Sequence, residues 1–173
     1  EEFMADTREW LTMSQISFSS GTAGNSEIPN YEHLALIGGG HGYVGDSGVA
    51  PVQPGNESLT WESTWTSNLG FHFGFWNRLN VDFELYCKRT TDMLMEVPKS
   101  YAESNGYGYV WDNVGAMLNM GAELNLTATV ITYKDFNWTV NANAGYNHNR
   151  IVELYNGVNE YETANTSTKL VVG

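Results

Sequence analysis

Two neighbouring carboxylates, Asp82 and Glu84, are the residues of this chain that come closest to an acid–base pair. Glycosidases place two such groups beside the bond that they cleave. In an extended segment both side chains point to one face, and Lys88 follows on that face. A structural contact among these charges is the simpler interpretation, so we expect no catalytic residue and no enzymatic activity.

A glycine pattern over residues 40–45 (GHGYVG) matches G-x-G-x-x-G, the phosphate-binding turn of dinucleotide sites. Such a site requires a helix directly after the turn, with its N-terminus facing the pyrophosphate. Residues 46–55 contain Pro51 and Pro54 and cannot form that helix, so we expect a flexible loop. His41 lies in this loop and the other histidines are scattered along the chain. We therefore expect no metal site and no cofactor.

Four aromatic residues are concentrated in one glycine-containing segment: Tyr101, Tyr107, Tyr109 and Trp111. Aromatic rings provide sugars with a stacking surface, and they give protein interfaces a large contact area at a low entropic cost. Packing of the same rings against neighbouring loops is an equal alternative. The sequence alone leaves substrate contact, partner contact and loop packing open.

Composition limits the classes of partner that this chain can bind. The chain has 173 residues, enough for one domain, with 8 Lys and Arg against 20 Asp and Glu and a formal net charge of −12. Nucleic-acid binding needs basic residues that neutralise phosphates, so no nucleic-acid partner is expected. Cys87 is the single cysteine, which excludes an intrachain disulfide. No apolar run approaches the ~20 residues of a membrane helix.

The elements that position these residues are predicted by an alternating pattern over residues 59–75. One face is mainly apolar and aromatic, with Trp61, Trp65, Leu69, Phe71, Phe73 and Phe75. The intervening positions are almost wholly polar, and a period of two indicates a β-strand. Ordinary strands have about 5–6 residues. A strand this long with a polar second face is typical of a membrane barrel, which has lipid outside and water or a plug inside.

Four other segments alternate in the same way, so we predict an antiparallel sheet of five strands in sequential order. The predicted strands cover residues 10–20, 59–75, 79–88, 114–130 and 136–147. Short turns at 77–78 and 133–135 alternate with long loops at 21–57 and 97–112 and with a polar tail from Tyr155. This asymmetry is typical of transmembrane barrels. Five strands cannot close, and lipid tolerates no open edge, so we expect them to be part of a larger barrel.

The apolar positions next to the short turns define the face that we expect to meet lipid. These positions are Phe71, Phe73, Val81, Phe83 and Leu85, and the residues expected to face the lumen are His72, Asp82 and Glu84. Arg89 and Arg150 continue the apolar face, but they lie beyond this band, on the side of the long loops. An arginine at the middle of the bilayer would cost about 2–4 kcal/mol, which their position avoids.

Several segments resemble the SusC/RagA family of TonB-linked outer-membrane proteins. The similar segments are residues 19–25 (SSGTAGN), 59–62 (LTWE), 78–80 (RLN), 88–94 (KRTTDML), 113–123 (NVGAMLNMGAE), 134–138 (KDFNW), 146–149 (YNHN), 154–157 (LYNG) and 169–173 (KLVVG). They follow the order of the family motifs and cover nearly the whole chain. Ser17 and Cys87 depart from the pattern, which has a basic and a polar residue there.

The resemblance implies that residues 1–173 belong to a single β-barrel domain, from the C-terminal half of a transporter whose roughly 22-stranded barrel has a plugged lumen. It implies import of glycans or oligosaccharides, or sometimes peptides, across the bacterial outer membrane. It also implies a TonB complex that supplies energy and a SusD-like surface lipoprotein that acts as a lid. The plug domain and the TonB box are expected to lie outside this chain. The four loop aromatics become candidates for contact with the substrate or the lid.

A soluble β-sandwich that binds carbohydrate is the alternative. Such a module would explain the alternating segments and the aromatic loop. It would not explain strands this long, or an apolar band that lies next to the short turns. We therefore favour the membrane barrel.

Overall fold

The computed structural model describes residues 7, 9–28, 30–102, 104, 106–162 and 169–173. Of the described residues, 70% lie in strands and very few lie in a helix. In the described part of the chain, no helix has the length and apolar character needed to cross a membrane. Two compact units are present. Unit one comprises Glu1–Thr22, Trp65–Arg89 and Leu118–Arg150, and unit two comprises Ala23–Thr64, Thr90–Met117 and Ile151–Gly173.

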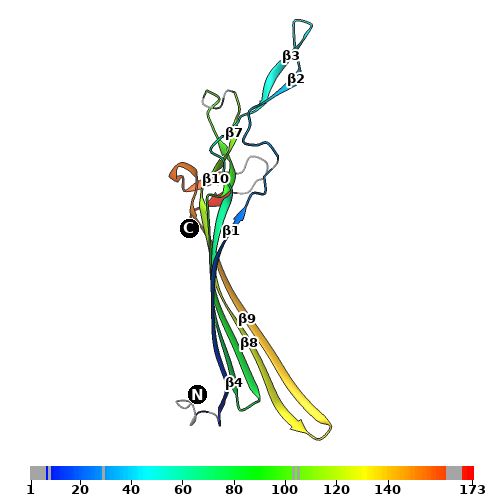
Figure 1. Cartoon of the computed structure of the whole chain (residues 1–173), viewed down its shortest axis with the longest axis vertical. Coiled ribbons are helices and arrows are strands. Elements are labelled where there is room, and N and C mark those ends of the chain that lie inside the picture. Colours follow the sequence, from blue (N-terminus) through cyan, green and yellow to red (C-terminus); the bar gives the residue numbers. More distant parts are fainter. Residues whose placement is uncertain (1–6, 8, 29, 103, 105, 163–168) are drawn as a thin grey trace. The chain divides into compact units, whose positions relative to one another are not determined.

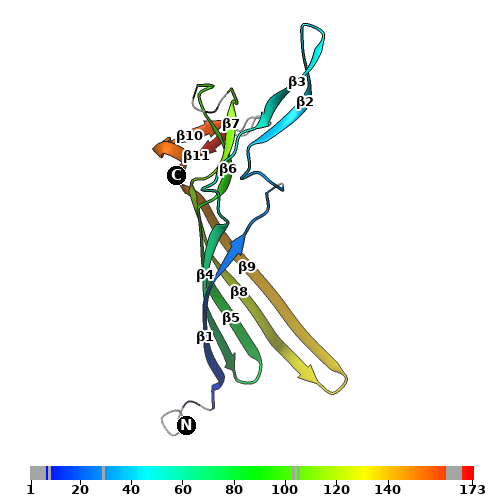
Figure 2. The same ribbon diagram turned by 45° about the horizontal axis from the view of Figure 1, so that its top comes forward.

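One five-stranded sheet has the order β1-β4-β5-β8-β9, and its strands lie side by side in Figures 1 and 2. The strands are β1 (Leu11–Asn25), β4 (Glu62–Phe75), β5 (Leu79–Thr91), β8 (Ala116–Tyr133) and β9 (Phe136–Glu153). The predicted sheet of five sequential antiparallel strands is confirmed. Most of these strands run further than predicted, because ladder hydrogen bonds continue where the side chains become polar.

The start of β4 differs from the prediction in the opposite direction. The strand was expected from Leu59, but it begins at Glu62. Leu59 instead closes a turn, because its N–H donates to the carbonyl of Asn56 at 3.2 Å. The backbone of Thr60 is bound by a side chain, that of Asn113. These two residues therefore lie outside the strand.

Tight turns link the two hairpins of unit one, the first centred one residue before the predicted position 77–78 and the second within the predicted 133–135. After β4, Trp76 and Asn77 both have positive φ values, of 53° and 52°, and the N–H of Arg78 donates to the carbonyl of Phe75 at 2.9 Å. Two central residues with positive φ are the pattern of a type I′ turn, whose twist matches that of paired strands. After β8, Lys134 also has a positive φ, of 41°. These turns place β4 beside β5 and β8 beside β9.

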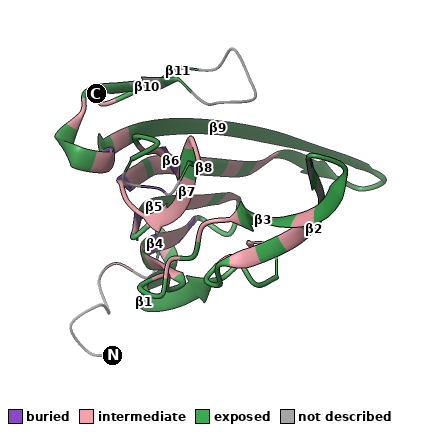
Figure 3. Ribbon diagram, turned by 90° about the horizontal axis from the view of Figure 1, so that it is seen from above, coloured by how far each residue is buried: buried purple, intermediate pink, exposed green. Residues whose placement is uncertain are grey.

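The strands of unit one are largely exposed, as the green and pink ribbons of Figure 3 show. Large apolar side chains such as Phe18 and Tyr146 keep 71% and 67% of their surface. The buried apolar residues among the described ones, Val97, Ala116 and Leu154, all belong to unit two. A β-sandwich buries the inner faces of two packed sheets. Among the described residues, unit one has one sheet and no such core, so the sandwich alternative is wrong.

Unit two contains three short hairpins in segments that were expected to be loops. They pair β2 (Leu36–Tyr43) with β3 (Asp46–Gln53), β6 (Leu94–Pro98) with β7 (Tyr109–Asn113), and β10 (Glu160–Glu162) with β11 (Lys169–Val171). A short 3₁₀ turn, η2 (Tyr155–Gly157), precedes β10. Glycines and prolines obscured the alternation, whereas pairing depends on backbone groups. The long-loop predictions were therefore incomplete.

The G-x-G-x-x-G segment forms the end of the β2–β3 hairpin. Val44 and Gly45 occupy its turn with positive φ values of 52° and 90°, and Asp46 opens β3. The interpretation that no helix follows this motif is confirmed. The expectation of a flexible loop is wrong, because the motif lies in paired strands. Without a helix N-terminus, this segment lacks the feature that holds a pyrophosphate.

Candidate functional site

A chain of polar contacts crosses three strands on one face of unit one. His72 Nδ1 lies 2.9 Å from Asp82 Oδ1, and Ser17 Oγ lies 3.5 Å from His72 Nε2. An ionised carboxylate only accepts hydrogen bonds, so Nδ1 carries the hydrogen and donates to Asp82. The side chains of His72 and Asp82 are 25% and 43% exposed. The contacts join β1, β4 and β5 on the polar face predicted from the sequence.

The order Ser17–His72–Asp82 is that of a hydrolase triad, but the geometry favours a structural role. The distance of 3.5 Å from Ser17 to His72 is beyond the 2.5–3.0 Å usual for a hydroxyl donor. Ser17 also lies inside the long strand β1, whereas a nucleophile elbow presents its serine on a sharp strand-to-helix turn. Asp82 is bound to His72, which also weakens its interpretation as an acid–base partner of Glu84.

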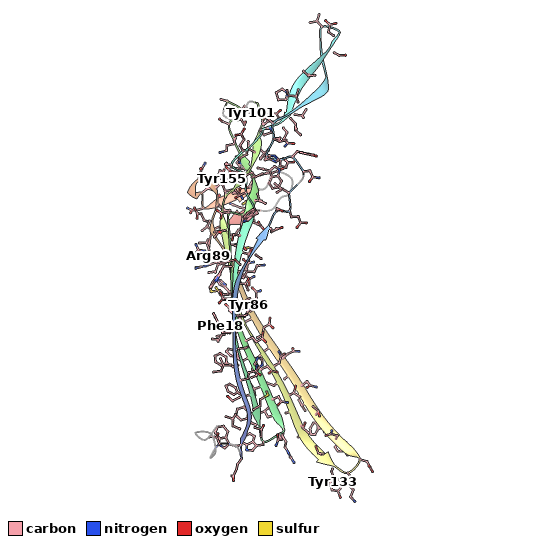
Figure 4. All side chains as sticks on the ribbon, viewed as in Figure 1. Phe18, Tyr86, Arg89, Tyr101, Tyr133 and Tyr155 are labelled. Atoms are coloured by element: carbon pink, nitrogen blue, oxygen red, sulfur yellow. The ribbon has the colours of Figure 1, made fainter. Side chains whose placement is uncertain are left out.

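Glycines shape the rest of this polar face. A Cβ at Gly70 would lie 2.5 Å from Ser17 Oγ and 3.1 Å from His72 Nε2. At Gly121, a Cβ would collide with the ring of Tyr86. The glycines therefore allow larger polar side chains to lie across the strands. A hollow of about 360 Å³ is present, and Phe18 and Tyr86, labelled in Figure 4, are among its lining residues. Its other lining residues are Ser17, Ser19, Asn68, Leu69, Gly70, Glu84 and Glu123.

Aromatic side chains gather on the opposite face. The rings of Phe71 on β4 and Phe83 on β5 stack with centroids 6.3 Å apart. Phe73 lies 6.2 Å from Phe75, and Phe75 stacks on Trp10 at 6.1 Å. Such pairs stabilise neighbouring strands by about 0.5–1.5 kcal/mol beyond the burial of their area. His72 contacts Asp82, whereas Phe71 stacks on Phe83. Residues adjacent in sequence therefore point to opposite faces of the sheet.

The remaining predicted face residues follow the same alternation. Val81 precedes Asp82 and is half-buried, like Phe71, Phe73 and Phe83. Leu85 follows Glu84 and keeps 38% of its surface. The sequence-predicted residues thus form two sets, one aromatic and aliphatic, the other polar. The sequence did not predict Ser17 as a partner of His72; position 17 had been noted only as a departure from the family pattern.

The four loop aromatics differ in their exposure and surroundings. Tyr101, labelled in Figure 4, is 73% exposed, and Tyr109 is 43% exposed. Tyr109 and Trp111 occupy alternate positions of β7 and therefore share a face, with Glu96 of β6 opposite Trp111. Tyr107 precedes β7 and lines a cavity. The structure separates two exposed rings from a ring in a cavity wall.

That cavity lies within unit two and has a volume of about 670 Å³. Its polar lining residues are Gln53, Asn56, Ser58, Lys99, Ser104, Tyr107, Asp112 and Asn156, and its other lining residues are Ala35, Leu36, Ile37, Pro51, Pro54, Gly55, Pro98 and Val110. Of these residues, Tyr107 alone was predicted from the sequence as a contact residue. The others are distant in sequence and carry no shared motif, so only the fold identifies them as one site.

Hydrogen bonds fix one wall of this cavity. Asn56 Nδ2 donates to the carbonyl of Trp111 at 2.9 Å and to Asp112 Oδ1 at 3.2 Å. The backbone N–H of Asn113 donates to the same carboxylate oxygen at 2.9 Å. Ser104 donates to the carbonyls of Ser100 and Tyr107. The lining side chains are thereby held in defined positions.

Two ionisable groups of unit two have shifted pKa values. Burial raises the pKa of Glu32 above its usual value, and the nearby charge of Glu96 raises it further. A hydrogen bond to Glu160, at 2.7 Å, raises the pKa of Lys169. In the described part of the chain, no three His, Cys, Asp or Glu residues gather in a way that could hold a metal ion.

Comparisons with known proteins agree with this architecture. The TonB dependent receptor P39 of Formosa agariphila is 34% identical over 155 residues, which are 89% of this chain and 15% of that protein. The TonB-dependent receptor SusC of Bacteroides thetaiotaomicron is 32% identical over 165 residues, covering 91% and 16%. A solved structure of the RagAB peptide importer in its open-open state has a TM-score of 0.84 and 37% identity, covering 95% and 18%.

The chain therefore spans less than a fifth of the length of these relatives. The profile of the family described as TonB dependent receptor-like, beta-barrel matches residues 10–171. Members of this family are outer-membrane β-barrel proteins of Gram-negative bacteria. The long two-faced strands, the tight hairpin turns and these matches together show that the chain belongs to the TonB-dependent receptor β-barrel family.

Proposed function

We propose that residues 1–173 form part of a single transporter barrel domain, and that the plug and the TonB box belong to other parts of the longer protein. The family match over residues 10–171 supports this assignment. So does the exposure of the strands in unit one, where Phe18 and Tyr146 keep most of their surface. Soluble domains bury such side chains in a core. A sheet of this kind needs other material on both of its faces.

The aromatic face is the one that meets lipid, and the polar face is the one that lines the lumen. Phe71, Phe73, Val81, Phe83 and Leu85 form the lipid side. His72, Asp82 and Glu84 form the lumen side. The observation that carries this proposal is the pair of contacts across one hairpin, with Phe71 stacked on Phe83 and His72 bound to Asp82. In a barrel, lipid-facing and lumen-facing residues alternate along each strand.

The complete protein imports oligosaccharides or peptides across the outer membrane, with energy delivered through a TonB complex and with a SusD-like lipoprotein as its lid. The named relatives support both substrate classes, because one is SusC and another is a peptide importer. The relatives are named as receptors and importers, which supports a function other than catalysis. Tyr101, Tyr107, Tyr109 and Trp111 contact the substrate or the lid.

Uptake by cells that lack the gene tests this function directly. Labelled oligosaccharides and labelled peptides are supplied to the deletion strain with and without the complete protein restored, and with TonB present or removed. We expect accumulation of at least one class that requires both the restored protein and TonB. Purification in detergent is expected to recover a surface lipoprotein with the barrel. Equal uptake of both classes in the deletion and restored strains would contradict the proposal.

A further inference from the structure

The cavity of about 670 Å³ in unit two is lined by Lys99, whose side chain has no carboxylate partner among the described residues. Unit two contains two basic residues, Lys99 and Lys169. Lys169 is paired with Glu160 at 2.7 Å, whereas Lys99 lines the cavity and has no ion pair with a described residue. Acidic residues far outnumber basic ones in this unit. Among the described residues, no carboxylate therefore neutralises the Lys99 ammonium, and a ligand can supply that charge.

The cavity also contains acceptor and apolar groups that are already in place. Asp112 uses one oxygen, Oδ1, to accept from Asn56 and from the backbone of Asn113. Its other oxygen, Oδ2, accepts no hydrogen bond from a described residue. The ring of Tyr107 and the side chain of Pro98 add apolar surface. A volume of this size falls within the range of about 300–1,000 Å³ that is common for small-ligand sites.

We propose that this cavity binds the carboxylate-bearing end of an imported substrate, with the ammonium of Lys99 contacting the carboxylate. The free oxygen of Asp112 accepts a hydrogen bond from a hydroxyl or amide group of the same ligand. The shared chemistry is a carboxylate beside hydrogen-bond donors, which a uronic acid and the C-terminal residue of a peptide both provide. This inference rests on the proposed import function and adds a charge preference to it.

Physical chemistry favours a carboxylate over a neutral group at Lys99. A hydrogen bond to a charged group contributes about 1.5–3 kcal/mol, more than a neutral one. Ammonium and carboxylate attract more strongly in a cavity than in open water, because the effective dielectric constant is lower. Asp112 lines the same cavity, and its Oδ1 already accepts two hydrogen bonds, whereas its Oδ2 accepts none from a described residue. A ligand that carries both charge and donors satisfies both residues at once.

The test measures binding to the complete transporter in detergent with two matched pairs of probes. One pair is an oligosaccharide that ends in glucuronic acid and the same oligosaccharide ending in glucose. The other pair is a short peptide with a free C-terminal carboxylate and its C-terminal amide. Lys99→Gln removes the charge, Lys99→Arg keeps it, and Lys169→Gln is the control, because it removes the other basic side chain of the unit. Heat-modifiability in electrophoresis checks that each variant folds.

We expect the carboxylated member of at least one pair to bind more tightly than its neutral partner. Lys99→Gln should weaken that binding about tenfold or more and leave the neutral probe within about twofold. Lys99→Arg should restore much of the preference, and Lys169→Gln should not change it. The responding pair identifies the source of the carboxylate.

Three results overturn the inference. The first is equal affinity for charged and neutral probes, and the second is an unchanged preference in Lys99→Gln. The third is that none of the four probes binds. TonB-dependent uptake of a carboxylated substrate that Lys99→Gln leaves unaltered would refute the carboxylate site alone and leave the import function standing. Equal uptake by cells with and without the protein would refute the import function itself.

Discussion

Asn113 holds the backbone of Thr60 with a pair of hydrogen bonds, one in each direction. Its Oδ1 accepts from the Thr60 N–H at 2.6 Å, and its Nδ2 donates to the Thr60 carbonyl at 2.8 Å. The same Nδ2 donates to the carbonyl of Asp92 at 2.9 Å. A single carboxamide at the end of β7 thus takes the place of a neighbouring strand for Thr60. It also ties the segment before β4 to the segment before β6.

Replacing Asn113 should lower the local stability of unit two around Thr60, because one side chain holds two segments there. Asn113→Asp keeps the acceptor and loses both donors, and it leaves the carbonyls of Thr60 and Asp92 without these partners. An unsatisfied polar group costs about 1–3 kcal/mol where it is buried and less where water reaches it. We expect faster limited proteolysis between residues 54 and 62 of the complete protein.

Asn137→Asp is the matched control for that substitution. Asn137 Oδ1 accepts from Thr132 Oγ1 at 3.2 Å, and an aspartate retains this acceptor. Its proteolysis should match that of the parent protein. Equal cleavage of the Asn113→Asp and Asn137→Asp proteins would show that the two hydrogen bonds to Thr60 do not hold this segment.

Adjacent substitutions on β5 test the two faces of the sheet. Phe83→Arg places a charge on the proposed lipid face and should lower the free energy of unfolding by about 2–4 kcal/mol near the middle of the bilayer. Asp82→Asn on the other face preserves an acceptor for His72 and should cost much less. Unfolding by urea in detergent or lipid measures both, with Phe83→Leu as the control for loss of the ring stack. Similar losses for Phe83→Arg and Asp82→Asn would refute the assigned faces.

The raised pKa of Glu32 gives the stability of unit two a testable pH dependence. Its pKa is raised in the folded state from the ordinary value of 4.5, so the folded chain binds this proton more tightly than the unfolded chain. Stability therefore falls as pH rises through the raised pKa and is recovered as pH falls. Glu32→Gln should stabilise the protein at pH 7, and the gain should vanish near the ordinary carboxyl pKa.

Thermal unfolding at several pH values measures this effect, with Glu27→Gln as a neighbouring control for the change in net charge. The difference in Tm between Glu32→Gln and the parent protein should shrink steadily from neutral to acid pH. A gain that is constant with pH would show that the carboxyl titration is not its cause. A loss at neutral pH would reverse the predicted sign.

The sheet could be predicted because apolar and polar residues alternate along the whole length of each strand. The cavity has no such repeating pattern and could not be predicted. Alternation over 59–75 requires only that neighbouring side chains differ, and the turn at Trp76 and Asn77 confirms where the hairpin reverses. The β2–β3 hairpin contains six glycines and prolines among its sixteen strand residues, and these residues are also loop signals. Lys99 and Asn56 line the same cavity because the folded chain brings their segments together. No local sequence pattern predicts that arrangement.

The final prediction separates the loop aromatics by their exposure. Tyr101 and Tyr109 keep 73% and 43% of their surface, so replacing both with alanine should leave folding unchanged and weaken lid association. Tyr107 lines the cavity, so Tyr107→Ala should weaken substrate binding instead. The hydroxyl oxygen of Tyr107 is buried without a hydrogen-bond partner among the described residues. Tyr107→Phe should therefore keep the binding affinity and should not lower stability.

Recovery of the lipoprotein with the purified barrel measures lid association, and probe binding in detergent measures the substrate site. The double Tyr101→Ala and Tyr109→Ala variant should reduce the first and spare the second, because exposed rings contribute contact area to a partner. Tyr107→Ala should reduce substrate binding and leave lid association unchanged. If both variants retain full lid association and substrate binding at normal expression, the rings only pack against neighbouring loops.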